Sequence, residues 1–141
     1  MTAIEGGCLC GAVRYHITAR PITTRVCWCR LCQYFAAGNA TVNVTFPSQS
    51  IVVTGETSDF PSIADSGNKM HRRFCPKCGT HLFSEAEVRP HLTVVRAGTL
   101  DDPTVAKPEI TIWTSQAPSW AQIDPGIPQH PHQPPPPKST S

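Results

Sequence analysis

Hydrophobic and polar residues alternate in several short stretches of the chain. In residues 13–17 the hydrophobic positions are Val13, Tyr15 and Ile17, and residues 42–46 repeat this pattern. Strict alternation is typical of a β-strand with one buried face. Further strands are predicted at residues 51–54, 91–97 and 109–113, which are rich in β-branched residues or alternate in the same way.

Helical patterning is scarce. Only residues 31–37 suggest a helix, of one or two turns, and the predicted strands are separated by Gly, Pro, Asn and Asp. This arrangement predicts a mostly-β domain of short strands with little helix. The polar residues 56–69 are interpreted as a long loop that covers another part of the molecule.

The length of 141 residues corresponds to a single domain. We assign residues 1–125 to this domain and residues 126–141 to a proline-rich C-terminal tail, which contains four consecutive prolines at 134–137. We expect the tail to be extended and solvated unless it packs on the body.

Composition and charge exclude several kinds of protein. Hydrophobic residues make up 39% of a chain with a net charge of only +2 and no basic cluster, which argues against a nucleic-acid partner. No apolar stretch approaches the roughly 20 residues that span a membrane. The N-terminus lacks the charged start and apolar core of a secretory signal, so we expect a cytoplasmic protein with reduced thiols.

The seven cysteines form three tight clusters. Their odd number rules out a complete set of intramolecular disulfides, and a reduced compartment favours metal thiolates. Zinc holds thiolates about 2.3 Å away, and cysteines separated by one or two residues reach one ion from a tight turn. The clusters are Cys8/Cys10, Cys27/Cys29/Cys32 and Cys75/Cys78.

Seven thiolates divide naturally into a closed site of four and an open site of three. Four thiolates complete a structural zinc site, and three leave a position for water or substrate, as in a catalytic site. The spacing leaves two partitions open. Cys29/Cys32 with Cys75/Cys78 would make a zinc ribbon, whereas Cys8/Cys10 with Cys75/Cys78 would leave Cys27/Cys29/Cys32 as a triad.

Four motifs resemble the glutathione-dependent formaldehyde-activating enzyme family, whose domain also occurs in centromere protein V. They are GGCLCGAVRY at 6–15, CWCRLCQ at 27–33, RFCPKCGTHL at 73–82 and IWTSQAPSW at 112–120, and the resemblance extends over residues 5–128. It implies a mostly-β, Mss4-like fold built on zinc knuckles, with two zinc ions per chain. Carried over by position, it also implies a structural site of Cys8, Cys10, Cys75 and Cys78 and a catalytic site of Cys27, Cys29 and Cys32.

The implied activity is that of a carbon–sulfur lyase that joins glutathione, or a related thiol, to formaldehyde as S-(hydroxymethyl)glutathione. A thiol at the open zinc position would ionise and add to the aldehyde carbon. One position departs from the family: Trp28 replaces the usual histidine between the first two triad cysteines. Trp28 is interpreted as a packed aromatic, with an altered substrate pocket as the alternative.

Other side chains are candidates for supporting roles. His71, His81 and His91 are possible proton carriers, although strand residues facing solvent or a neighbour are commoner. The alternatives to an enzyme are a non-catalytic zinc-binding interaction module and a redox or metal-handling triad. Arginine pairs well with carboxylates, and the candidates to anchor glutathione are Arg14, Arg30, Arg72, Arg73 and Arg96.

Overall fold

The computed structural model describes residues 3–64 and 66–135, which form two sheets. The smaller sheet is antiparallel, in the order β1 (Ile4–Gly7), β2 (Arg14–Ile17) and β5 (Ile51–Thr54). The mostly-β expectation is therefore confirmed, and two of the predicted strands lie in this sheet.

No helix in the described part of the chain has the length and apolarity needed to cross a membrane.

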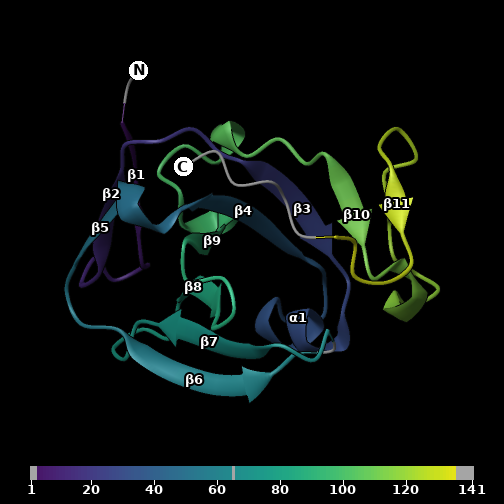
Figure 1. The fold of residues 1–141 in the computed structure, drawn as a ribbon, viewed down its shortest axis with the longest axis horizontal. Coiled ribbons are helices and arrows are strands. Elements are labelled where there is room, and N and C mark those ends of the chain that lie inside the picture. Colours follow the sequence, from purple (N-terminus) through teal and green to yellow (C-terminus); the bar gives the residue numbers. More distant parts are fainter. Residues whose placement is uncertain (1–2, 65, 136–141) are drawn as a thin grey trace.

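The larger sheet has eight strands in the order β11-β10-β3-β4-β9-β8-β7-β6. Its neighbours are antiparallel except β10, which runs parallel to both β3 and β11. The sheet curls, so that β6 and β7 lie across from β3 and β4 (Figure 1). The strands are β3 (Thr23–Cys27), β4 (Thr41–Pro47), β6 (Ser58–Ile63), β7 (Lys69–Phe74), β8 (His81–Ala86), β9 (Leu92–Arg96), β10 (Ile110–Ile112) and β11 (Gln129–His130).

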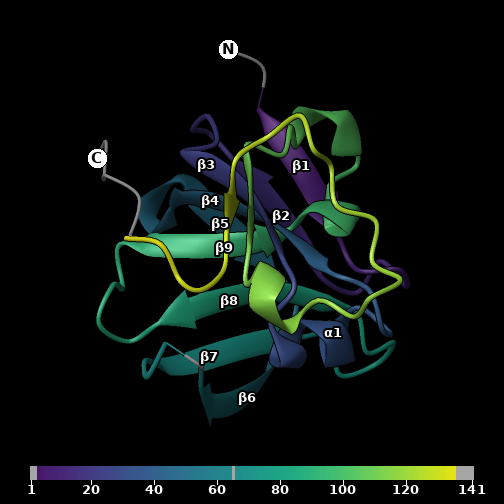
Figure 2. The same ribbon diagram turned by 90° about the vertical axis from the view of Figure 1, so that its right-hand side faces the viewer.

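The predicted helix is α1 (Arg30–Phe35), which follows β3 directly. It lies between β4 and β7 inside the curl (Figure 1), and Figure 2 shows it at one end of the stacked strands β9, β8, β7 and β6. Four 3₁₀ turns complete the described structure: η1 (Ser48–Ser50), η2 (Ala97–Thr99), η3 (Pro103–Val105) and η4 (Thr114–Gln116).

The alternating positions predicted from the sequence form the main core. Val13, Ile17, Val44 and Phe46 are completely buried, as is Leu82 of β8. Full burial of such a side chain stabilises the fold by roughly 1.5–3 kcal/mol. The pattern therefore identified the buried faces of β2 and β4 correctly.

The loop prediction for residues 56–69 is wrong for β6, which pairs antiparallel with β7. Residue 65, in the same stretch, lies outside the described residues. Because β6 is an edge strand, Phe60 and Ile63 stay exposed and its burial does not alternate. Pro61 is tolerated at a sheet edge, where no ladder partner needs its missing N–H.

The proline-rich tail also differs from a solvated segment. Gln129 and His130 form β11 against β10, and Pro134 is buried. The tail contacts the body as far as Pro135, so the packed alternative applies to this part of it, although most of its side chains are exposed. Residues 136–141 lie outside the described residues.

Candidate metal centres and substrate cavity

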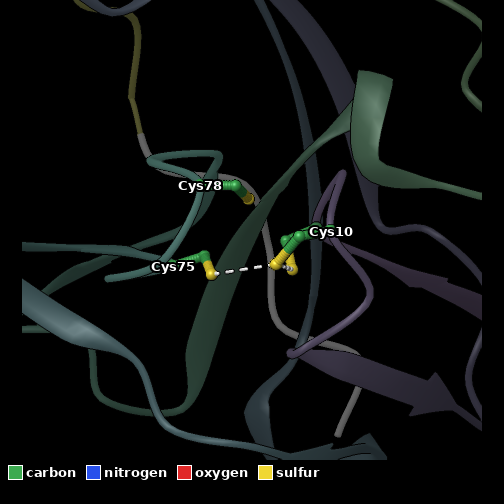
Figure 3. Close-up of side chains that lie close together, drawn as sticks. Cys10, Cys75 and Cys78 are labelled. Atoms are coloured by element: carbon green, nitrogen blue, oxygen red, sulfur yellow. Dashed lines mark hydrogen bonds between the residues drawn. The ribbon is translucent and has the colours of Figure 1, made fainter.

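Two separate turns bring four cysteines together. Cys8 and Cys10 lie in the turn after β1, and Cys75 and Cys78 lie in the turn between β7 and β8. Figure 3 shows Cys10 facing Cys75 and Cys78 across the gap between the two turns. Their four sulfur atoms all lie within 4.8 Å of one another, with 3.6 Å between Cys8 and Cys10 and 3.8 Å between Cys10 and Cys75. Sulfurs about 2.3 Å from the centre of a tetrahedron lie about 3.8 Å apart, so this donor set fits a zinc ion.

Backbone and hydroxyl groups hold these sulfurs in place. The Val13 amide donates to the Cys8 sulfur at 3.2 Å, and the Lys77 amide donates to the Cys75 sulfur at 3.4 Å. The Thr80 hydroxyl and amide lower the pKa of Cys78 to about 5. Gly79, with φ of 77°, closes the second turn in the left-handed region, which glycine adopts without strain. The pKa of Cys10 is raised to about 11 because it shares hydrogen bonds with the other three sulfurs, so negative charge in the cluster is favoured at Cys78.

The other three cysteines form a second cluster at the end of β3. Cys27 is its last residue, Cys29 caps α1, and Cys32 lies in the first turn of α1. Their sulfurs also lie within 4.8 Å of one another, and all three side chains are buried. The Cys32 amide donates to the Cys29 sulfur at 3.3 Å, so the helix cap itself orients the cluster. The structure thus forms the four-plus-three partition.

A buried glutamine braces the loop that carries the triad. Gln33 is only 5% exposed, and its amide nitrogen donates to the Trp28 carbonyl at 2.8 Å and the Gln116 carbonyl at 3.0 Å. Its carbonyl accepts from the Arg30 guanidinium at 2.6 Å. These bonds connect the triad loop to η4, whose residues come much later in the sequence.

The triad lies in a positive environment. The pKa of Cys32 is lowered, because Cys27 and Cys29 donate hydrogen bonds to its sulfur and Arg96 lies nearby. The pKa of Cys27 is raised, because it donates to the other two sulfurs and is buried. Negative charge on the cluster is therefore held at Cys32, the sulfur that Arg96 stabilises.

A cavity of about 150 Å³ opens on the triad. All three cysteines line it, together with four arginines that come from separate strands and a turn. No carboxylate is among its lining residues in the described ranges 3–64 and 66–135. The cavity therefore suits an anion or a group that becomes negative. The arginines are Arg25, Arg72, Arg89 and Arg96.

Only two of the arginines singled out from the sequence reach this cavity, Arg72 and Arg96. The other three bond elsewhere. Arg14 pairs with Asp101, Arg73 with Glu85, and Arg30 with Gln33. The sequence did not point to Arg25 or Arg89, because neither residue belongs to a recognisable motif.

The three candidate histidines do not line the triad cavity. His71 lies between the carboxylates of Asp59 and Glu87, at 2.6 and 2.8 Å. The ring of His81 packs between Phe35 and Phe74, and burial lowers its pKa. His91 is exposed. Their positions agree with the commoner interpretation of strand histidines.

Trp28 also has a structural place. It is 2% exposed, meets Trp120 edge to face at 6.3 Å between ring centroids, and does not line the triad cavity. These contacts agree with the interpretation as a packed aromatic.

Comparisons with known proteins agree with this arrangement. The sequence model of the glutathione-dependent formaldehyde-activating enzyme family matches residues 3–116. A Halomonas elongata protein, provisionally named as such an enzyme, is 28% identical over 127 residues, covering 86% of this chain and 81% of its own length. A crystal structure of a Rhodobacter sphaeroides protein has a similar fold, with a TM-score of 0.55 at 16% identity, over 89% of this chain and 98% of that one.

Proposed function

The chain belongs to the glutathione-dependent formaldehyde-activating enzyme family, and from this premise we propose that it is a zinc-dependent carbon–sulfur lyase. Its substrates would be glutathione or a related thiol and an aldehyde such as formaldehyde, joined as an S-(hydroxymethyl) adduct. The observation that carries the proposal is the difference between the two clusters. Four sulfurs close one site, whereas three sulfurs open on a cavity lined by arginines.

Each cluster has its own role in this proposal. Cys8, Cys10, Cys75 and Cys78 would hold a structural zinc that joins the β1–β2 turn to the β7–β8 turn. Cys27, Cys29 and Cys32 would hold the catalytic zinc. That ion would act as a Lewis acid and lower the pKa of a substrate thiol.

The residues of the chain supply the rest of the chemistry. Arg72 and Arg96 line the cavity, and their guanidinium groups favour negative charge on sulfur and on the developing oxygen. The substrate thiol loses its proton to solvent, and its sulfur forms a bond to the aldehyde carbon. The carbonyl π electrons move to oxygen, which then takes a proton, so the sum is thiol plus aldehyde giving the hydroxymethyl thioether. The reverse sequence releases the aldehyde.

The test compares Cys29→Ala with Cys10→Ala, a matched cysteine variant in the other cluster. Metal content, circular dichroism and the NMR exchange rate between formaldehyde and the glutathione adduct are measured for each. We expect Cys29→Ala to lose about one zinc, keep its fold and lose the rate acceleration. We expect Cys10→Ala to lose the other zinc and much of its stability. Unchanged zinc content in Cys29→Ala would contradict the catalytic site.

Cobalt substitution distinguishes the enzyme from a non-catalytic interaction module. An open three-sulfur site changes its sulfur-to-cobalt absorption when glutathione is added, and the four-sulfur site does not. A spectrum that is unchanged by glutathione in protein carrying two cobalt ions would contradict the proposal.

A further inference from the structure

The C-terminal residues 129–135, called the strap here, lie beyond the residues that the family model matches, which end at 116. The strap follows β10 and η4 through successive hydrogen bonds. The Trp113 amide donates to the His132 carbonyl at 3.3 Å, and the Ser115 hydroxyl donates to the Pro131 carbonyl at 2.6 Å. With Pro134 buried, the strap is a fixed part of the domain.

The strap also holds a strained residue at the triad cavity. Trp113 has φ of 58° and ψ of 36°, a left-handed conformation that is costly for a bulky side chain, and it lines the cavity. Its indole N–H donates to the Gln133 side-chain oxygen at 3.0 Å, and its ring meets His132 edge to face. Such strain persists where surrounding contacts impose it, and it is concentrated at functional sites.

Gln133 lines the same cavity as the triad. Because its oxygen accepts from Trp113, its side-chain amide group is oriented and its NH₂ remains a donor. Arg25 lines the cavity too, two residues before Cys27 on β3, so both side chains lie on the same face of that strand. The strap's Pro135 carbonyl accepts from the Arg25 guanidinium at 3.3 Å.

The strap leaves part of Arg25 unpaired. The Nε atom of Arg25 is buried and has no hydrogen-bond partner among the described residues. A buried charged donor without a partner is costly, and a bound acceptor relieves that cost. No carboxylate of the described residues lines the cavity, so a carboxylate on a ligand would give Arg25 the anionic partner that this cavity lacks.

We propose that the strap is part of the substrate site, and that Gln133 and Arg25 together bind the negatively charged end of the thiol substrate while its sulfur occupies the triad. This inference rests on the proposed function and narrows the range of thiol substrates. The substrate is a thiol that carries a carboxylate, and the residues that recognise the carboxylate lie partly outside the family-matched region.

The test uses two thiols of similar size, 3-mercaptopropionate, which is anionic, and 2-mercaptoethanol, which is neutral. Dissociation constants are measured from the sulfur-to-cobalt absorption of the cobalt-loaded protein, and kcat and KM with formaldehyde from NMR exchange on the zinc protein. The variant Gln133→Glu keeps an acceptor for Trp113 but adds a negative charge at the cavity. Gln129→Glu, on the exposed side of β11, adds the same charge away from it.

We expect Gln133→Glu to weaken binding of 3-mercaptopropionate at least about 10-fold and of 2-mercaptoethanol less than about 2-fold, because like charges repel only the first ligand. Arg25→Met should weaken binding of the anionic thiol by a similar factor. Gln129→Glu should change neither thiol by more than about 2-fold. The effects should appear in KM, with kcat nearly unchanged.

The outcomes separate this inference from the proposed function. If the wild-type protein binds neither of these thiols nor glutathione at the cobalt site, the proposed function fails and the strap proposal fails with it. If it binds glutathione but not 3-mercaptopropionate, the strap proposal alone is overturned. If the wild type binds and turns over both thiols, but Gln133→Glu weakens them equally or not at all, the strap proposal alone is overturned.

Discussion

Replacing Gln33 by methionine should loosen the triad loop and lower the stability of the protein. Gln33 makes three hydrogen bonds, to the Trp28 carbonyl, the Gln116 carbonyl and the Arg30 guanidinium. Methionine has a similar length and volume, so the change removes these bonds without opening a large cavity. The perturbation therefore isolates the polar brace from the packing around it.

The expected cost follows from the burial of these groups. Leaving a buried carbonyl without its donor costs about 1–3 kcal/mol, and the Trp28 carbonyl is bonded to Gln33 in a buried environment. The bonds to Gln116 and Arg30 are only partly buried, and each contributes about 0.5–1 kcal/mol. We therefore expect a loss of about 2–5 kcal/mol in the free energy of unfolding.

Urea unfolding of the zinc-loaded protein, followed by circular dichroism, measures this loss. Competition with a chelator measures zinc affinity at the triad, which should fall because the loop is less ordered. Gln49→Met is the matched control, since Gln49 is exposed in η1 and should change stability by less than about 0.5 kcal/mol. A change below about 0.5 kcal/mol for Gln33→Met would refute the bracing role.

Three further variants test other parts of the structure. Gly6→Ala places a methyl group 2.3 Å from the Thr99 carbonyl oxygen and should lower the free energy of unfolding in urea by more than about 2 kcal/mol. Gly98→Ala is the control, because its methyl group would meet nothing within 4 Å and should cost less than about 1 kcal/mol. Equal effects of the two substitutions would refute the packing argument. Trp28→His introduces the residue usual in the family and should lower the free energy of unfolding by about 3 kcal/mol, because Trp28 is buried. Zinc content, measured by mass spectrometry, should stay at the wild-type value, because Trp28 lies outside the cavity. Loss of zinc would contradict this expectation. His71 has a raised pKa through its two carboxylate partners, so its stabilisation is complete below the unfolded value of 6.5 and is lost as pH rises through the higher folded value. Wild type should therefore lose urea stability relative to His71→Gln between those two values, and parallel pH profiles would exclude this linkage.

The sequence predicted β2, β4, β5, β9 and β10 and the cysteine clusters, because residue pattern and cysteine spacing are both local signals. β2 buries every second residue, Val44 and Phe46 of β4 join the same core, and α1 begins within the triad motif. Six strands were missed, which are β1, β3, β6, β7, β8 and β11. For β6 and β11 the structure gives a physical reason. Both strands are held by pairing with one neighbour and not by burial of an alternating face, and proline occurs in or beside each of them.

The cavity was the hardest part to predict. Its four arginines come from β3, β7, β9 and the turn before β9, and no spacing in the chain relates them. Arg14 was equally plausible from the sequence, but a partner distant in the chain, Asp101, takes its charge at the surface. Which arginine faces the triad is decided by the curl of the eight-stranded sheet, a tertiary feature with no local signature.

The positions of the two clusters along the chain set an order of assembly. The triad is complete as soon as residue 32 has been synthesised, whereas the four-sulfur site needs the turn that ends at Cys78. Closing that second site joins distant segments and carries the larger loop-closure entropy. The strap comes later still, because β11 adds to the sheet only after residues 129 and 130 have been synthesised. Under the proposed function, the triad cysteines are therefore available to a metal ion well before their cavity has its final wall.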